Sequence, residues 1–144
     1  MKEIGFTPKF VDIDVIIVLG KGKRYLGEHS LQCCGRGDRW YNTTGWCTYT
    51  TCGITAADAL ATSLYNAATK FLPGHRLRTD YTDGDPDLEA DFYILRHTLC
   101  PSCLSENGLM DSEESLSFLE SEAGKKAILA LHVEGIINYV NSCR

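Results

Sequence analysis

The sequence predicts an α/β fold in which helices pack on one mixed β-sheet. Two segments of strand length, 10–19 and 91–99, are rich in Val, Ile, Leu and aromatic residues. Two longer segments, 55–72 and 125–141, instead repeat apolar residues at helical spacing. The elements follow the order β-β-α-β-α-α, which favours a mixed sheet covered by helices. A length of 144 residues suits a single domain, 1–144.

A β-hairpin is predicted near the start of the chain. Asp12 and Asp14 alternate with apolar residues, and the continuous apolar run 15–19 then indicates a strand buried on both faces. The Gly-Lys-Gly-Lys sequence at 20–23 indicates a turn, and 24–27 begins the returning strand.

Residues 32–46 are predicted to form a loop that carries Trp40, Tyr41 and Trp46. Its glycines and asparagine are typical of irregular structure, and loops on a rigid frame often line binding sites. We expect these aromatic side chains either to contact a ligand or to cover the edge of the core.

The clearest helix is predicted over 55–72. Thr55 can cap its start, and Pro73 and Gly74 end it. Cys52 follows a stretch of β-favouring residues and is expected at the helix N-terminus, where the helix dipole favours a thiolate. The apolar face of the helix consists of Ala57, Leu60, Ala61, Leu64, Ala68, Phe71 and Leu72.

A polar segment at 74–90 follows this helix. Its composition is weakly similar to that of a calcium-binding loop. No glutamate lies at the spacing that an EF-hand loop requires, so an EF-hand is not predicted. The acidic residues of the segment include Asp80, Asp83, Asp85 and Asp87.

The predicted strand 91–99 leads directly into a Cys-x-x-Cys pair, Cys100 and Cys103, and a turn is expected at 105–108. An acidic helix is then predicted at 112–122, followed by the last helix. Together they form a unit of C-terminal helices, 111–144.

Composition excludes several classes of function. The net charge of −5 and the pI near 5.3 argue against broad electrostatic binding to nucleic acid. The sequence has no apolar run of membrane-spanning length and no apolar segment of the kind that signal peptides carry. We therefore expect a cytoplasmic protein that does not contact a membrane and that is able to form a homo-oligomer.

The chain has seven cysteines, and this odd number favours metal or thiol chemistry over a disulfide framework. Cys52 and the Cys100/Cys103 pair each follow a predicted strand, so neighbouring strands would bring three sulfurs to one edge of the sheet. Three thiolates with one open position form a zinc site that can acidify bound water. This pattern assigns no role to the other four cysteines, Cys33, Cys34, Cys47 and Cys143.

Over residues 10–105 these elements resemble the zinc-dependent cytidine deaminase superfamily. In that family a hairpin precedes a Cys-Ala-Glu or His-Ala-Glu sequence that opens a helix, and a later strand leads into Pro-Cys-x-x-Cys. Here Thr51–Cys52–Gly53–Ile54 stands at the first motif and Leu99–Cys100–Pro101–Ser102–Cys103 at the second. The resemblance implies a three-layer sandwich with zinc on Cys52, Cys100 and Cys103.

The same resemblance implies hydrolytic deamination of a nucleobase or nucleotide, with Trp40, Tyr41 and Trp46 as candidates for stacking on the base. Ile54 replaces the glutamate that transfers protons in the family. Asp58 is a candidate acid–base residue, although it lies on a different face of the helix. We therefore expect either a deaminase with another acid–base group or an inactive relative that holds zinc.

Two other interpretations stay open. In the first, Cys52–Gly53–Ile54–Thr55 resembles the helix start of papain-like thiol enzymes, with Cys52 as the nucleophile and His97 or His75 as its base. In the second, the cysteines hold a structural zinc ion that stabilises a protein-binding module, such as a phage or effector inhibitor.

Overall fold

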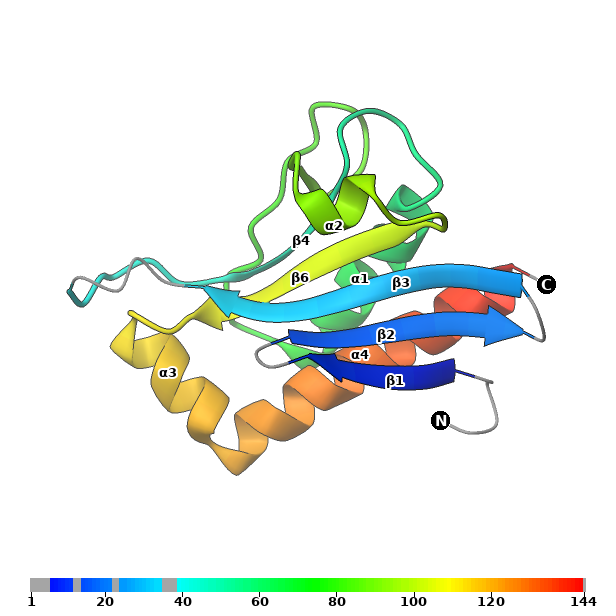
Figure 1. The fold of residues 1–144 in the computed structure, drawn as a ribbon. Helices are drawn as coiled ribbons and strands as arrows, with labels where there is room; N and C mark the ends of the chain where they lie inside the picture. Colours follow the sequence, from blue (N-terminus) through cyan, green and yellow to red (C-terminus); the bar gives the residue numbers. More distant parts are fainter. Residues whose placement is uncertain (1–5, 12–13, 22–23, 35–38, 144) are drawn as a thin grey trace.

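The computed structural model describes residues 6–11, 14–21, 24–34 and 39–143, with side chains from residue 39 onward. The strands form one mixed sheet in the order β1-β2-β3-β6-β4-β5 (Figure 1). The predicted α/β fold with helices packed on the sheet is confirmed. The strands are β1 (Phe6–Val11), β2 (Asp14–Lys21), β3 (Arg24–Cys34), β4 (Trp46–Thr50), β5 (Leu88–Glu89) and β6 (Ser102–Leu109).

The first three strands form an antiparallel meander. The predicted hairpin is confirmed by the pairing of β2 with β3. The single strand predicted at 10–19 is wrong, because β1 ends at Val11 and β2 begins at Asp14. The returning strand continues to Cys34, so Cys33 and Cys34 belong to β3 and not to the predicted loop. This extension lets β3 pair with β6 along most of the length of β6.

β6 is the strand that joins the meander to the rest of the sheet. It is parallel to β3 and antiparallel to β4, and β4 is in turn parallel to β5. Every residue from Ser102 to Gly108 is buried, although several are polar. Two of the polar side chains have internal partners: Ser105 Oγ lies 2.9 Å from His132 Nε2, and the Trp46 indole N–H donates to Asn107 Oδ1 at 2.9 Å. A polar sequence can therefore form the centre of this sheet.

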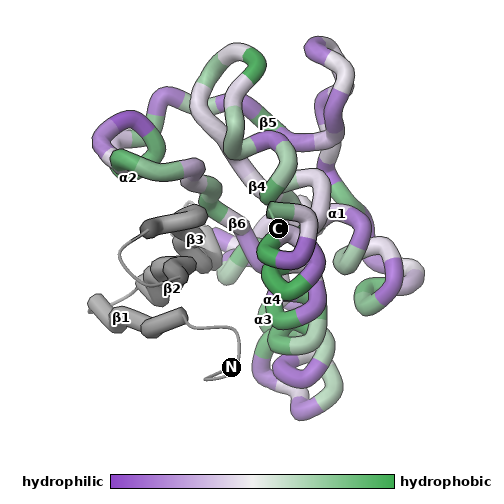
Figure 2. Tube along the Cα trace, turned by 90° about the vertical axis from the view of Figure 1, so that its right-hand side faces the viewer, coloured by the Kyte–Doolittle hydropathy of each residue, from purple (hydrophilic) through white to green (hydrophobic). Residues whose placement is uncertain are grey.

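Two helices, α1 and α4, cover one face of the sheet, and the short helix α2 lies on the other side (Figures 1 and 2). The helices predicted at 55–72, 112–122 and 125–141 are confirmed with small shifts of their bounds. None of the helices in the described residues is long and apolar enough to span a bilayer. The helices are α1 (Asp58–Phe71), α2 (Tyr93–Arg96), α3 (Glu113–Glu120) and α4 (Glu122–Ser142).

The core lies between α1, α4 and the sheet. Leu60 and Leu64 of α1 are fully buried together with Leu131 of α4, and Ile136 is 2% exposed. The two helices approach closely at Gly135, where an added Cβ atom would lie 3.0 Å from the Leu64 Cα atom. The alanines of α1 and this glycine allow the close contact that the alanine-rich face indicates.

Two predictions between residues 91 and 108 are wrong. The strand predicted at 91–99 is instead an irregular segment with the single-turn helix α2, of which only Leu95 is buried. An ion pair between Arg96 and Asp91 at 2.8 Å and the bonds of the turn stabilise this conformation. The turn predicted at 105–108 belongs to β6, because the pairing of β6 with β3 and β4 outweighs the local turn preference of these residues.

Candidate functional site

The carboxyl ends of β3 and β6 meet at one edge of the sheet. These strands are parallel, and Cys34 at the end of β3 pairs with Leu109 at the end of β6. In open α/β sheets, ligands commonly bind just outside the carboxyl ends of the strands. Reactive side chains are therefore expected at this edge of the sheet.

Glu106 lies near this edge on the central strand and is 6% exposed. Its neighbours Ser105 and Asn107 face the helical side, since Ser105 contacts His132 of α4 and Asn107 accepts from the core residue Trp46. Side chains alternate along a strand, so Glu106 projects from the opposite face. A carboxylate is costly to bury, and one held on the central strand is a candidate acid–base group.

Cys47 lies beside Glu106 in the antiparallel pair of β4 and β6 and is fully buried. Burial raises the pKa of the Cys47 thiol to about 11; the nearby Arg78 guanidinium opposes this shift, and the Glu106 carboxylate adds to it. Burial likewise raises the pKa of Tyr49, the next residue of β4 on the same face. At neutral pH both groups keep their protons, and Glu106 and the half-buried Arg78 are the other two titratable groups near Cys47.

The loop before β4 borders the same edge. The backbone N–H of Tyr41 donates to the carbonyl of Asp111, just beyond β6, at 2.7 Å. Trp40 is 57% exposed, and the Arg39 guanidinium lies 5.1 Å from the centre of the Tyr41 ring. An exposed aromatic side chain at this position can contact a ligand that reaches the carboxyl ends of the strands.

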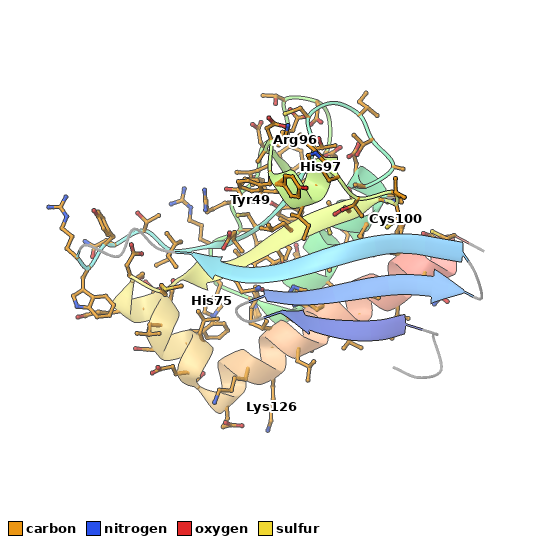
Figure 3. All side chains as sticks on the ribbon, viewed as in Figure 1. Tyr49, His75, Arg96, His97, Cys100 and Lys126 are labelled. Atoms are coloured by element: carbon orange, nitrogen blue, oxygen red, sulfur yellow. The ribbon has the colours of Figure 1, made fainter. Side chains whose placement is uncertain are left out.

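On the helical side of this edge lies a small cavity of about 40 Å³. Trp46, Asn107 and Gly108 contribute to its walls, together with His75 and Phe118, whose rings are 4.2 Å apart. Figure 3 labels His75 at this end of the molecule and Cys100 at the other end of β6. A cavity of this volume holds a few water molecules and is far smaller than a typical ligand pocket.

A second acidic group lies at the opposite end of β4. Oxygen atoms of Asp58, Asp85 and Asp87 lie within 4.8 Å of one another, and this group could hold a metal ion. It is the only set of three potential metal ligands among the residues that the structure describes. Its donors are all carboxylate oxygens, whereas tightly held zinc usually has cysteine or histidine ligands, so this set does not fit the predicted zinc.

The three cysteines expected to bind zinc do not form such a group within the described chain. Cys103 lies inside β6, is fully buried, and has a pKa raised by burial. Cys52 is exposed in the turn after β4, and α1 begins only at Asp58. Cys100 is half-buried and borders an open groove formed with Thr51 and Leu95. Cys103 belongs to the strand itself and does not follow a strand, which distinguishes its surroundings from those of the exposed Cys52.

The residues proposed for the thiol enzyme are also separated. The His97 ring stacks on Tyr93 with centres 4.0 Å apart, and its Nδ1 atom lies 2.9 Å from the carbonyl oxygen of Tyr93. His75 is exposed at the far end of β6 from the turn that holds Cys52. Asp58, the other candidate acid–base residue, accepts hydrogen bonds from the backbone N–H and the hydroxyl of Thr55, both at 2.6 Å.

Of the three aromatic residues expected to bind a ligand, Trp46 belongs to the core. It is 2% exposed, and its ring packs edge-on against Tyr65 with centres 5.0 Å apart. Trp40 and Tyr41 lie in the loop described above. Sequence reasoning missed Glu106 because Ser105–Gly108 was interpreted as a turn.

No family model matches the chain, and no curated protein sequence matches it. Solved structures do share its fold. An N-acetylmuramoyl-L-alanine amidase from Clostridium difficile 630 matches with a TM-score of 0.67 and 20% identity, over 79% of this chain and 57% of that one. The N-acetylmuramoyl-L-alanine amidase AmiC2 of Nostoc punctiforme matches with a TM-score of 0.65 and 24% identity, over 78% and 57%.

The CwlD amidase from Clostridioides difficile, solved in complex with the GerS lipoprotein, matches with a TM-score of 0.61 and 19% identity, over 84% of this chain and 57% of that one. The chain thus spans little more than half the length of these structures. Their fold overturns the predicted relation to cytidine deaminases, and with it the deaminase activity. The thiol-enzyme and zinc-module interpretations likewise do not match these neighbours.

Proposed function

We propose that the protein is an amidase-type hydrolase whose substrate is the amide bond between an N-acetylmuramoyl group and L-alanine. The observation that carries this proposal is the likeness of its fold to several N-acetylmuramoyl-L-alanine amidases, with TM-scores of 0.67 and 0.65 for two of them. The chain spans 57% of each of these structures, so the proposal concerns the part of the fold that is shared.

Glu106 is the residue to which we assign the acid–base role. It lies near the carboxyl ends of β3 and β6, where α/β folds place their reactive groups. As a carboxylate it can accept a proton from a water molecule that attacks the amide carbon. It can then return that proton to the alanine nitrogen as the C–N bond breaks. One oxygen is added to the acyl carbon, and the products are a carboxylic acid and a free amine.

Two neighbouring groups are proposed to support this reaction. Arg78 places a positive charge on the same side of the sheet and can stabilise negative charge that develops on the amide oxygen. Trp40 is exposed at the same edge, and its flat ring offers an apolar surface to a sugar ring. In this proposal a muropeptide replaces the nucleobase as the expected ligand.

Zinc stays a prediction for this activity. The acidic group of Asp58, Asp85 and Asp87 does not have the ligands that zinc prefers. Metal analysis of the purified protein, with and without added zinc during the assay, tests this prediction. The cytoplasmic location and the homo-oligomer also stay predictions.

The decisive experiment is digestion of purified peptidoglycan, followed by mass spectrometry of the products and quantification of new alanine N-termini. We expect release of peptides that begin with L-alanine. Glu106→Gln should lower the rate by about 100-fold or more, because Gln cannot transfer the proton. Glu113→Gln, at an exposed position of α3, is the matched control and should retain full activity. No release with or without added zinc, or equal activity of Glu106→Gln, would contradict the proposal.

A further inference from the structure

Asp87 is a buried carboxylate with an incomplete set of hydrogen bonds. It is 2% exposed, and one of its oxygens accepts from the Thr50 hydroxyl at 2.6 Å. The other oxygen, Oδ1, is buried and has no hydrogen-bond partner among the described residues. A charged oxygen that is removed from water without a partner is costly, so a proton or a cation is needed beside it.

The groups next to Asp87 carry the same charge. Oxygens of Asp58 at the start of α1 and of Asp85 in the preceding loop lie within 4.8 Å of an Asp87 oxygen and of each other. The carboxylates therefore repel one another when all three are ionised, and a bound cation would remove that repulsion.

The surrounding structure holds these oxygens in place. Asp58 accepts two hydrogen bonds of 2.6 Å from Thr55, and the backbone N–H of Asp87 donates to Asp85 Oδ1 at 3.4 Å. A carboxylate oxygen that accepts one hydrogen bond keeps a lone pair for a cation. The Thr50 bond likewise orients Asp87 toward its neighbours.

The donors identify the class of cation. All three are carboxylate oxygens, which suit hard ions such as calcium and magnesium. Calcium binds oxygens at about 2.3–2.6 Å, so ligands on opposite sides of the ion are about 4.8 Å apart. Magnesium needs shorter distances of about 2.0–2.1 Å and a stricter octahedron. The three oxygens all lie within 4.8 Å of one another, which is close enough to surround one ion. They come from a loop and a helix start and not from a rigid octahedral cage, which favours calcium because its coordination geometry is flexible.

We propose that Asp58, Asp85 and Asp87 bind a calcium ion that ties the loop before β5 to the start of α1 and the end of β4. An EF-hand takes its ligands from a single loop, and the spacing of the acidic residues at 74–90 does not fit that loop. The proposed site differs from an EF-hand because Asp58 of α1 supplies one of its ligands. The site lies at the other end of β4 from Glu106. Calcium is therefore expected to stabilise the fold without taking part in the reaction.

Equilibrium dialysis with calcium, on the full chain after treatment with a chelator, tests the site directly. We expect one saturable calcium ion per chain and weaker binding of magnesium. Asp87→Asn should weaken binding by about tenfold or more, because it removes the buried charge. Asp83→Asn, an exposed aspartate of the same loop outside the group, is the matched control and should bind like the unchanged protein.

Thermal unfolding gives an independent readout. Calcium should raise the melting temperature of the unchanged protein and of Asp83→Asn, and should have little effect on Asp87→Asn. In chelator alone, Asp87→Asn should be about as stable as the unchanged protein, since it replaces a buried carboxyl group whose Oδ1 atom has no hydrogen-bond partner among the described residues. Asp85→Asn, at a less buried position, provides a second variant in case Asp87→Asn does not fold.

Three results would overturn the proposal. The first is the absence of saturable calcium binding at millimolar concentration, which would mean that Asp87 instead keeps a proton. The second is equal binding by Asp87→Asn and Asp83→Asn, which would mean that calcium associates only with the general negative charge of the surface. The third is tighter binding of magnesium than of calcium.

Discussion

Glu106 and Asp87 are both buried carboxylates, but they lie at opposite ends of the β4–β6 pair and in opposite electrostatic surroundings. Glu106 shares its side of the sheet with the cationic Arg78 and with groups that keep their protons. Asp87 faces Asp58 and Asp85 on the helical side, and burial together with these neighbours raises its pKa. A cationic side chain therefore lies near Glu106, whereas the charged groups that act on Asp87 among the described residues are both carboxylates.

The buried fraction of a carboxylate side chain therefore does not by itself identify its function. Glu106 and Asp87 are similarly inaccessible, at 6% and 2% exposure. What separates them is the set of neighbours, because an opposite charge favours the ionised form and like charges disfavour it. We therefore assign proton transfer to Glu106 and cation binding to the Asp87 group. If these assignments are correct, substitutions at one end should not alter the behaviour of the other.

His132 lies on α4 above the middle of β6, between the two ends. Its Nδ1–H donates to the Ile128 carbonyl at 2.7 Å, so the neutral ring accepts at Nε2 from the Ser105 hydroxyl at 2.9 Å. Burial lowers its pKa from 6.5 to about 4. Between pH 6.5 and pH 4 the His132 side chain is protonated in the unfolded chain but stays neutral in the folded protein. The free energy of unfolding should therefore fall by about 3 kcal/mol as the pH drops through this range.

Urea unfolding at several pH values measures this loss. The comparison should be made with His132→Gln, in which the histidine contribution is absent. The raised pKa of Asp87 acts in the opposite direction, because the folded state then holds the proton, and its effect cancels in the difference between the two proteins. Equal pH dependence of both proteins would show that His132 is not the responsible group.

Trp46→Phe tests the Glu106 end. The substitution removes the indole N–H that donates to Asn107 and leaves space beside Tyr65. We expect a loss of about 2 kcal/mol in the free energy of unfolding, since a buried acceptor loses its donor. This loss should be the same in calcium and in chelator. A loss that depends on calcium would show that the two ends are coupled.

Thr50→Val tests the Asp87 end with nearly the same side-chain volume. It removes the hydroxyl that donates to Asp87 at 2.6 Å. In chelator we expect a loss of about 1 kcal/mol in the free energy of unfolding, measured in urea. Thr82→Val, at an exposed position of the loop, should change stability little. If Thr50→Val also reduced the amidase rate, the proposed independence of the two ends would be wrong.

Local patterns predicted the helices well, for a physical reason. The apolar spacing of α1 and α4 arises because each helix buries one face, and this spacing is visible without any partner. The hairpin of β2 and β3 was equally visible, because a glycine-rich turn separates two strand-like segments. The prediction of a strand at 91–99 is wrong, because Leu95 is the only buried residue of this segment. The other residues are at least partly exposed, so they gain little from the burial that a central strand provides.

The class of the fold, the hairpin and the main helices follow from the sequence alone, because an element that buries one face repeats its apolar residues at a short, regular spacing. Three features depend on the three-dimensional arrangement: the polar stretch Ser105–Gly108 forms part of a central strand, Cys103 is fully buried, and Asp58 lies beside Asp85 and Asp87. These outcomes depend on which strands are neighbours. Contacts between distant parts of the chain set the order of the strands, so the spacing of apolar residues within one short segment does not predict it.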